Sequence, residues 1–219
     1  MDRDDVTALN RKIRETARTG RLIDIFKEII ADEVKPQFEF SPALDKESQN
    51  ELIIMLSDVH YGIVCNSMYN VYNTDIAKKR MNEYLQKILL IASTHNADAC
   101  HLFLGGDLIS GNIHPTIVAE NAINVIQQIK EFSDLLSRFV YELSHLFFSV
   151  DIHWVPGNHS RVAQKANHNQ HGDYLDSLIP FYLKYSMQNQ QNVVVHDNLY
   201  DDEISVFEAK GHTYVGVHG

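Results

Sequence analysis

Three apolar segments of this chain each end in a short polar motif. Residues 52–56 run into Ser57-Asp58-Val59-His60, residues 99–104 into Gly105-Gly106-Asp107, and residues 147–155 into Pro156-Gly157-Asn158-His159. Short continuous apolar runs bounded by turn residues are typical of strands that are buried on both faces of a parallel sheet. Because the carboxyl ends of parallel strands meet at one edge, where α/β sheets bind ligands, the three motifs are expected to lie together.

The segments between these strands have apolar residues at helical spacing. We expect helices over residues 74–95, over residues 116–146 as one helix or a broken pair, and over residues 173–187 around Pro180. Residues 193–195, 204–207 and 213–217 predict further strands. Asp58 and Asp107 are 49 positions apart, and Asp107 and Asn158 are 51 apart, so each interval fits one strand–helix–strand unit. The predicted fold class is therefore α/β, with a largely parallel first half.

The N-terminal residues have a different pattern. Residues 2–34 have two apolar stripes at helical spacing, and Pro36 and Pro42 follow in a segment that is typical of a linker. We therefore expect a helical appendage over residues 1–45 and a core domain over residues 50–219. The apolar faces of the appendage must pack somewhere, and self-association or the cover of a sheet edge would both satisfy them.

Composition limits the possible functions. The hydrophobic share of 44% is enough for a sizeable core, and the formal net charge of −10 argues against nucleic-acid binding through a broad basic surface. An enzyme that meets phosphate through bound cations is not excluded, because metal ions invert the local sign of charge. The two cysteines, Cys65 and Cys100, are too few for a disulfide scaffold. With no signal peptide and no membrane-spanning run, a cytoplasmic protein without membrane contact is expected.

The polar motifs carry a set of side chains that suits a metal centre. The candidates are Asp58, His60, Asp107, Asn158 and His159, joined by His218 after the last predicted strand. Carboxylate, imidazole and amide donors without a thiolate suit manganese, iron or zinc. Two such ions held by a shared carboxylate form the clamp that phosphoester hydrolysis uses. Each residue alone has a plainer interpretation as a turn or cap residue.

Three motifs occur in order, each at the end of a predicted strand: Asp58-Val59-His60, Gly106-Asp107 and Gly157-Asn158-His159. Together they resemble the motifs of the calcineurin-like metallophosphoesterase superfamily. Val217-His218-Gly219 resembles the next histidine motif of that superfamily. The resemblance implies a β-sandwich flanked by helices in αββα layers. It also implies two divalent ions, with manganese as first choice and iron or zinc as alternatives. By analogy Asp58 and His60 hold one ion, Asn158 and His218 hold the other, and Asp107 bridges both. His159 would stabilise or protonate the leaving oxygen.

Two departures from the family pattern bear on the substrate. Ser110 stands where many members have an acidic residue that orients the catalytic histidine, and Ser160-Arg161 follows the Gly-Asn-His motif in place of an acid. Both changes resemble phage and bacterial members of the DNA-repair-exonuclease-like type. Arg161, with Lys165, is predicted to bind a substrate phosphate, and His114 to contact the substrate. Asn70, Tyr72, Asn73 and Arg80 fit either a substrate loop or a helix cap and its packing.

The expected activity is metal-dependent hydrolysis of a phosphodiester, with DNA as the leading substrate. Alternatives are a phosphomonoesterase, a cyclic-nucleotide phosphodiesterase, or an inactive interaction scaffold with the same fold. In the family, a closing Gly-His-x-His segment follows the histidine that matches His218, and the sequence stops at Gly219. The earlier Gly211-His212 is a poor substitute because Tyr214 stands where the second histidine is required. We therefore expect a core that is truncated before this motif or completed by another chain.

Overall fold

The computed structural model describes residues 50–113, 115–163 and 168–219. The expected appendage over residues 1–45, with its self-association, therefore lies outside the described residues. Among the described residues, no helix combines the length and the apolar character that are needed to cross a membrane.

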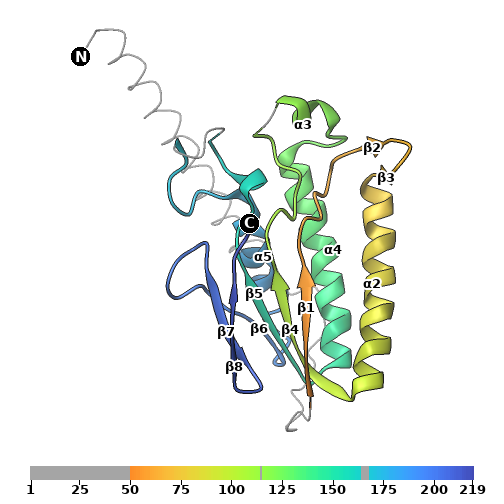
Figure 1. The fold of residues 1–219 in the computed structure, drawn as a ribbon, viewed down its shortest axis with the longest axis vertical. Helices are drawn as coiled ribbons and strands as arrows, with labels where there is room; N and C mark the ends of the chain where they lie inside the picture. The colour runs from red at the N-terminus through yellow and green to blue at the C-terminus, as the bar shows by residue number, and fades with distance from the viewer. Residues whose placement is uncertain (1–49, 114, 164–167) are drawn as a thin grey trace, which may run out of the picture.

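A four-stranded parallel sheet forms the centre of the molecule (Figure 1). Its strand order is β1-β4-β5-β6, formed by Asn50–Leu56, Ala97–Leu104, Ser149–Trp154 and Val193–Val195. Every pairing is parallel, with Leu56 opposite Leu104 and Leu104 opposite Trp154 at the carboxyl ends. The prediction of a parallel α/β first half is confirmed, and the three polar motifs begin at one edge.

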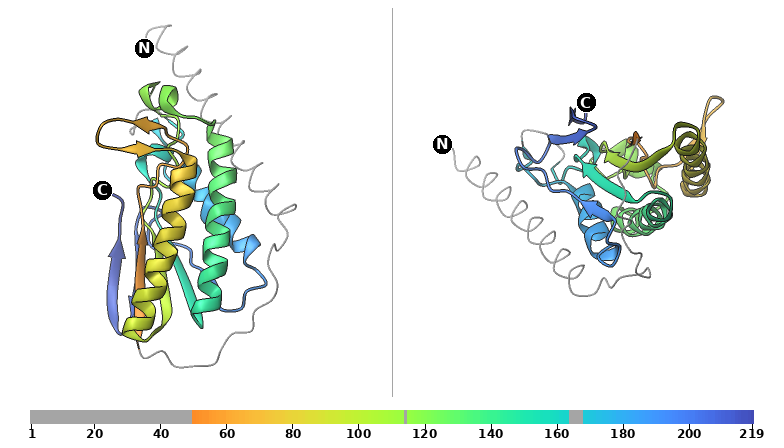
Figure 2. Two further views of the ribbon diagram at one scale, coloured as in Figure 1. Left: turned by 90° about the vertical axis from the view of Figure 1, so that its right-hand side faces the viewer. Right: turned by 90° about the horizontal axis from the view of Figure 1, so that it is seen from below.

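Helices α2 (Thr74–His95), α4 (Val125–Leu146) and α5 (Leu178–Ser186) lie on one face of this sheet (Figures 1 and 2). The apolar stripe of α4 is buried against it through Ile129, Phe132, Leu136, Val140 and Leu143. Of the two forms predicted for residues 116–146, the structure has the broken pair, because the short α3 (Pro115–Glu120) precedes α4. The helix predicted over residues 173–187 is shorter than expected, beginning at Leu178 after a 3₁₀ turn (Leu175–Ser177).

The opposite face of the sheet meets a hairpin of β7 (Ser205–Ala209) and β8 (His212–Gly216). Phe207 from the hairpin packs with Phe103 and Val155 in a second, smaller core. The hairpin leaves part of this face open, because Met55 in β1 is 60% exposed and Ile53 is also exposed. The prediction that β1 is buried on both faces is therefore wrong. One face of its apolar run is packed in the core, and the other face is largely open to solvent.

Candidate metal centre

The loops that follow β1 and β4 are joined by main-chain hydrogen bonds beyond the strand ends. The N–H of Asp58 donates to the carbonyl of Gly106 (3.1 Å), and the N–H of His60 donates to the carbonyl of Asp107 (2.9 Å). Asp58, His60 and Asp107 all have positive φ, between 47° and 54°. Such backbone costs about 1–3 kcal/mol per non-glycine residue and is concentrated at functional sites. Three of the five non-glycine residues with positive φ in the described part of the chain are therefore predicted metal ligands; the other two, Asn96 and Lys210, lie outside the site.

Two glycines allow the loop after β5 to approach the loop after β4. A Cβ on Gly157 would lie 1.9 Å from the Asp107 nitrogen, and one on Gly111 would lie 2.0 Å from the His159 carbonyl oxygen. No side chain fits at either distance. The close approach allows the N–H of His159 to donate to Asp107 Oδ1 (2.9 Å). The Asp107 carboxylate, which is 3% exposed, is thereby held between two strand ends.

Asp107 belongs to both groups of side chains whose donor atoms lie close enough to share a cation. One group is His60, Asp107 and His159, and the other is Asp58, Asp107 and His218; the donor atoms of each lie within 4.8 Å of one another. Asp107 Oδ2 is 3.9 Å from His60 Nε2, 4.0 Å from His159 Nε2 and 3.4 Å from His218 Nε2. A carboxylate common to both groups is the arrangement that a bridging ligand requires.

The hydrogen-bond geometry of His218 fits a metal ligand. Its Nδ1 lies 2.7 Å from the carbonyl oxygen of Gly105, which can only accept, so Nδ1 carries the proton. In the neutral form of this ring, Nε2 would offer its lone pair toward Asp107 Oδ2 (3.4 Å) and Asn158 Oδ1 (3.2 Å), which is the form in which a histidine ligates a cation. Three lone-pair atoms facing one another are stabilised by a cation between them, and a carbonyl that accepts from the other ring nitrogen is the usual support of a ligating histidine.

The imidazoles of His60 and His159 lie edge to face, with ring centroids 4.7 Å apart. Burial lowers the pKa of His60, against the opposing effect of Asp107, so this ring is neutral and able to ligate near pH 7. His159 Nδ1 lies 3.3 Å from the main-chain carbonyl of Ser110. This main-chain carbonyl holds the orientation of the His159 ring.

Asp176, just before α5, is a supporting residue that the sequence motifs do not indicate. Its carboxylate is buried and accepts from the Gly157 N–H (2.9 Å) and from the Ser160 hydroxyl (2.6 Å). Burial raises its pKa to about 7, although both hydrogen bonds oppose this. The carboxylate therefore fixes the loop that carries Asn158 and His159. In the sequence, Asp176 belongs to none of the three strand-end motifs, so its link to Ser160 is seen only in the structure.

The structure thus brings together Asp58, His60, Asp107, Asn158, His159 and His218. Arg161 lies beside the site, and its Nε–H donates to the Asn158 carbonyl (2.9 Å). His114 and Lys165 lie outside the described residues. His212, which begins β8, belongs to neither of the two donor groups found among the described residues.

Comparison with known proteins leaves the family of the chain open. No protein-family model matches it. It is 21% identical over 226 residues to the SPbeta prophage-derived uncharacterized protein YonJ of Bacillus subtilis (strain 168). The match covers all of this chain and 55% of that relative, so the chain spans about half the length of the protein that it matches.

Proposed function

We propose that this chain is a metal-dependent phosphoesterase with a dinuclear centre of the calcineurin-like type. The observation that carries the proposal is the buried carboxylate of Asp107, which is common to two groups of nitrogen and oxygen donors. Two divalent ions, manganese first and iron or zinc as alternatives, fit this donor set because it contains no thiolate. Asp58, His60, Asp107, Asn158 and His218 would hold them, within a fold of the αββα sandwich type.

The bound ions would polarise the phosphoryl oxygens and lower the pKa of a water molecule. His159 is the candidate for proton exchange with the leaving oxygen: its ring is oriented by the Ser110 carbonyl, and its Nε2 faces the site. Arg161, held at the Asn158 carbonyl, is the nearby cation for a non-bridging phosphate oxygen.

A phosphodiester, with DNA as the leading case, is the proposed substrate. Ser160-Arg161, in place of the acidic residue of many phosphatases, favours this choice. The prophage origin named for the relative agrees with a nuclease of phage or bacterial type. The net charge of −10 means that DNA would be bound locally at the metal ions and Arg161.

The test is hydrolysis with Mn²⁺ of bis-p-nitrophenyl phosphate, p-nitrophenyl phosphate, cyclic nucleotides, and single- and double-stranded DNA. We expect diesterase activity that is abolished by EDTA. Asp107→Asn should lose both activity and bound metal, because an amide cannot supply charge to two ions. Asp134→Asn, at a partly exposed residue of α4 outside both donor groups, is the matched control. Wild-type metal content in Asp107→Asn would overturn the dinuclear centre, and metal binding without any hydrolysis would favour the inactive scaffold.

A further inference from the structure

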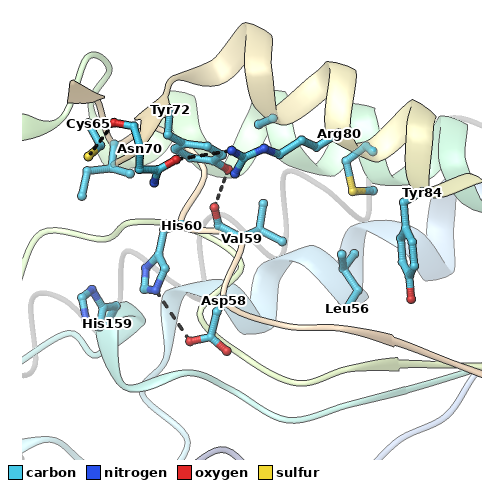
Figure 3. A pocket seen from close by; sticks show the side chains of 13 residues that line it. Leu56, Asp58, Val59, His60, Cys65, Asn70, Tyr72, Arg80, Tyr84 and His159 are labelled. Atoms are coloured by element: carbon cyan, nitrogen blue, oxygen red, sulfur yellow. Dashed lines mark hydrogen bonds and ion pairs between the residues drawn. The ribbon is translucent and has the colours of Figure 1, made fainter. Parts of the chain in front are cut away.

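A cavity of about 500 Å³ adjoins the candidate metal centre (Figure 3). It lies between the loop after β1, the small hairpin of β2 (Cys65–Asn66) and β3 (Val71–Tyr72), and the first turns of α2. Asp58, His60 and His159 line one end of it, and the volume is within the range of small-molecule sites. A ligand whose phosphate lies at the metal centre can therefore extend into this cavity.

The walls beyond Asp58 and His60 are mainly apolar. Leu56, Val59, Ile63, Met81 and Tyr84 contribute to them. A phosphate with only a sugar attached would leave these side chains in contact with water. A flat apolar group, by contrast, would displace that water and gain the free energy of apolar burial. The lining therefore favours a phosphoester that carries an aromatic ring.

The far end of the cavity is polar and carries a cation. The guanidinium carbon of Arg80 lies 5.3 Å from the centroid of the Tyr72 ring, and its Nη2 donates to Asn70 Oδ1 (3.3 Å). The Tyr72 hydroxyl in turn donates to the Val59 carbonyl (2.5 Å). Within the described part of the chain, no carboxylate forms an ion pair with Arg80. Arg80 is thus oriented by an aromatic ring and an amide, with further N–H groups left for an acceptor on a ligand.

We propose that this cavity binds the base of a nucleotide whose phosphate lies at the metal centre. A nucleobase combines a planar ring with carbonyl and ring-nitrogen acceptors at its edge, which matches the apolar walls and the donors of Arg80 and Asn70. The inference rests on the proposed function and narrows it: the substrate is a nucleotide phosphoester with at least one base that is free to leave its stack. Single-stranded DNA meets this requirement, whereas a simple alkyl phosphate does not.

The first experiment measures binding and needs no turnover. Thymidine 5′-monophosphate and 2-deoxyribose 5-phosphate are titrated by isothermal titration calorimetry, in Mn²⁺ and again in EDTA. We expect the nucleotide to bind about tenfold more tightly or better, as stacking of one base supplies. Arg80→Met should reduce this preference for the nucleotide several-fold and leave the affinity for the sugar phosphate unchanged. Lys79→Met, one position away on α2 and outside the cavity lining, is the control. Equal affinities of both ligands for the wild-type protein in both buffers would overturn the inference.

The second experiment separates this inference from the proposed function. Thymidine 5′-(p-nitrophenyl) phosphate and methyl p-nitrophenyl phosphate share a leaving group and differ in the nucleoside, which supplies both the sugar and the base. We expect a higher kcat/KM for the thymidine ester, and Arg80→Met should reduce that advantage with little change for the methyl ester. Hydrolysis of both esters at equal kcat/KM would refute the base site and keep the phosphoesterase. Base-dependent binding without hydrolysis of either ester would refute the phosphoesterase and keep a nucleotide site.

Discussion

We predict that the stack of rings beneath the β7–β8 hairpin makes the stability of the fold depend on pH. The ring centroid of His153, in β5, lies 4.0 Å from that of Phe207 and 4.7 Å from that of His196. The Nε2 atom of His153 is 3.1 Å from His101 Nδ1. Burial lowers the pKa of His153 to about 3, helped by the neighbouring histidines and opposed by Asp151. The ionisable groups contributed by the elements around the stack are Glu51, His101, Asp151, His196 and Lys210.

The sign and size of the effect follow from this pKa. Between its ordinary pKa of 6.5 and the folded value of about 3, His153 binds a proton in the unfolded chain and not in the folded one. The free energy of unfolding is therefore highest above about pH 6.5 and falls as the pH decreases toward 3. Each pH unit in this window changes the free energy of unfolding by about 1.4 kcal/mol. Between pH 8 and pH 5, His153 therefore lowers the free energy of unfolding by about 2 kcal/mol, nearly all of it below about pH 6.5.

Urea unfolding at pH 8, 6.5 and 5, with EDTA throughout to exclude metal dissociation, measures this loss. His153→Phe keeps a ring that can stack on Phe207 but cannot take up a proton. We expect the pH-dependent loss to shrink by about 2 kcal/mol in this variant, whatever its stability at pH 8. His145→Gln, an exposed position on α4, should keep the wild-type dependence. An equal loss in wild type and His153→Phe would refute the reasoning.

Three further predictions concern the candidate metal centre. Gly157→Ala should abolish metal binding in calorimetry, because its Cβ would overlap Asp107; Gly219→Ala, where a Cβ meets no neighbouring atom, should not. Asp176→Asn should weaken metal affinity by about 10–100-fold in the same assay, as losses of supporting hydrogen bonds do; unchanged affinity would remove its positioning role. His159→Ala should keep its metal and lose at least about 10²-fold in rate, as the loss of a general acid does. Loss of metal in the last variant would instead make His159 a ligand.

The strand ends and their order could be predicted from sequence because apolar runs and turn residues are local signals. Five of the six donor residues followed from this topology, since parallel strands bring their carboxyl ends together; the sixth, His218, follows β8 in the separate antiparallel hairpin and was predicted from its motif. Asp176 could not be predicted in the same way, because its link to Ser160 depends on how the segment before α5 packs. The exposure of Met55 was missed for a similar reason: an apolar run does not reveal how far a hairpin elsewhere in the chain covers it.

The tripeptide Asp58-Val59-His60 links the metal centre to the neighbouring cavity. Asp58 and His60 have left-handed backbone and direct their side chains to the candidate metal centre, whereas Val59 between them forms part of the cavity wall and accepts the hydrogen bond of Tyr72. The main-chain bonds from Asp58 and His60 to the loop after β4 hold all three in one conformation. Preorganisation of this kind reduces the entropy lost when a ligand binds. A phosphate and its attached base would thus meet surfaces whose separation is fixed by three consecutive residues.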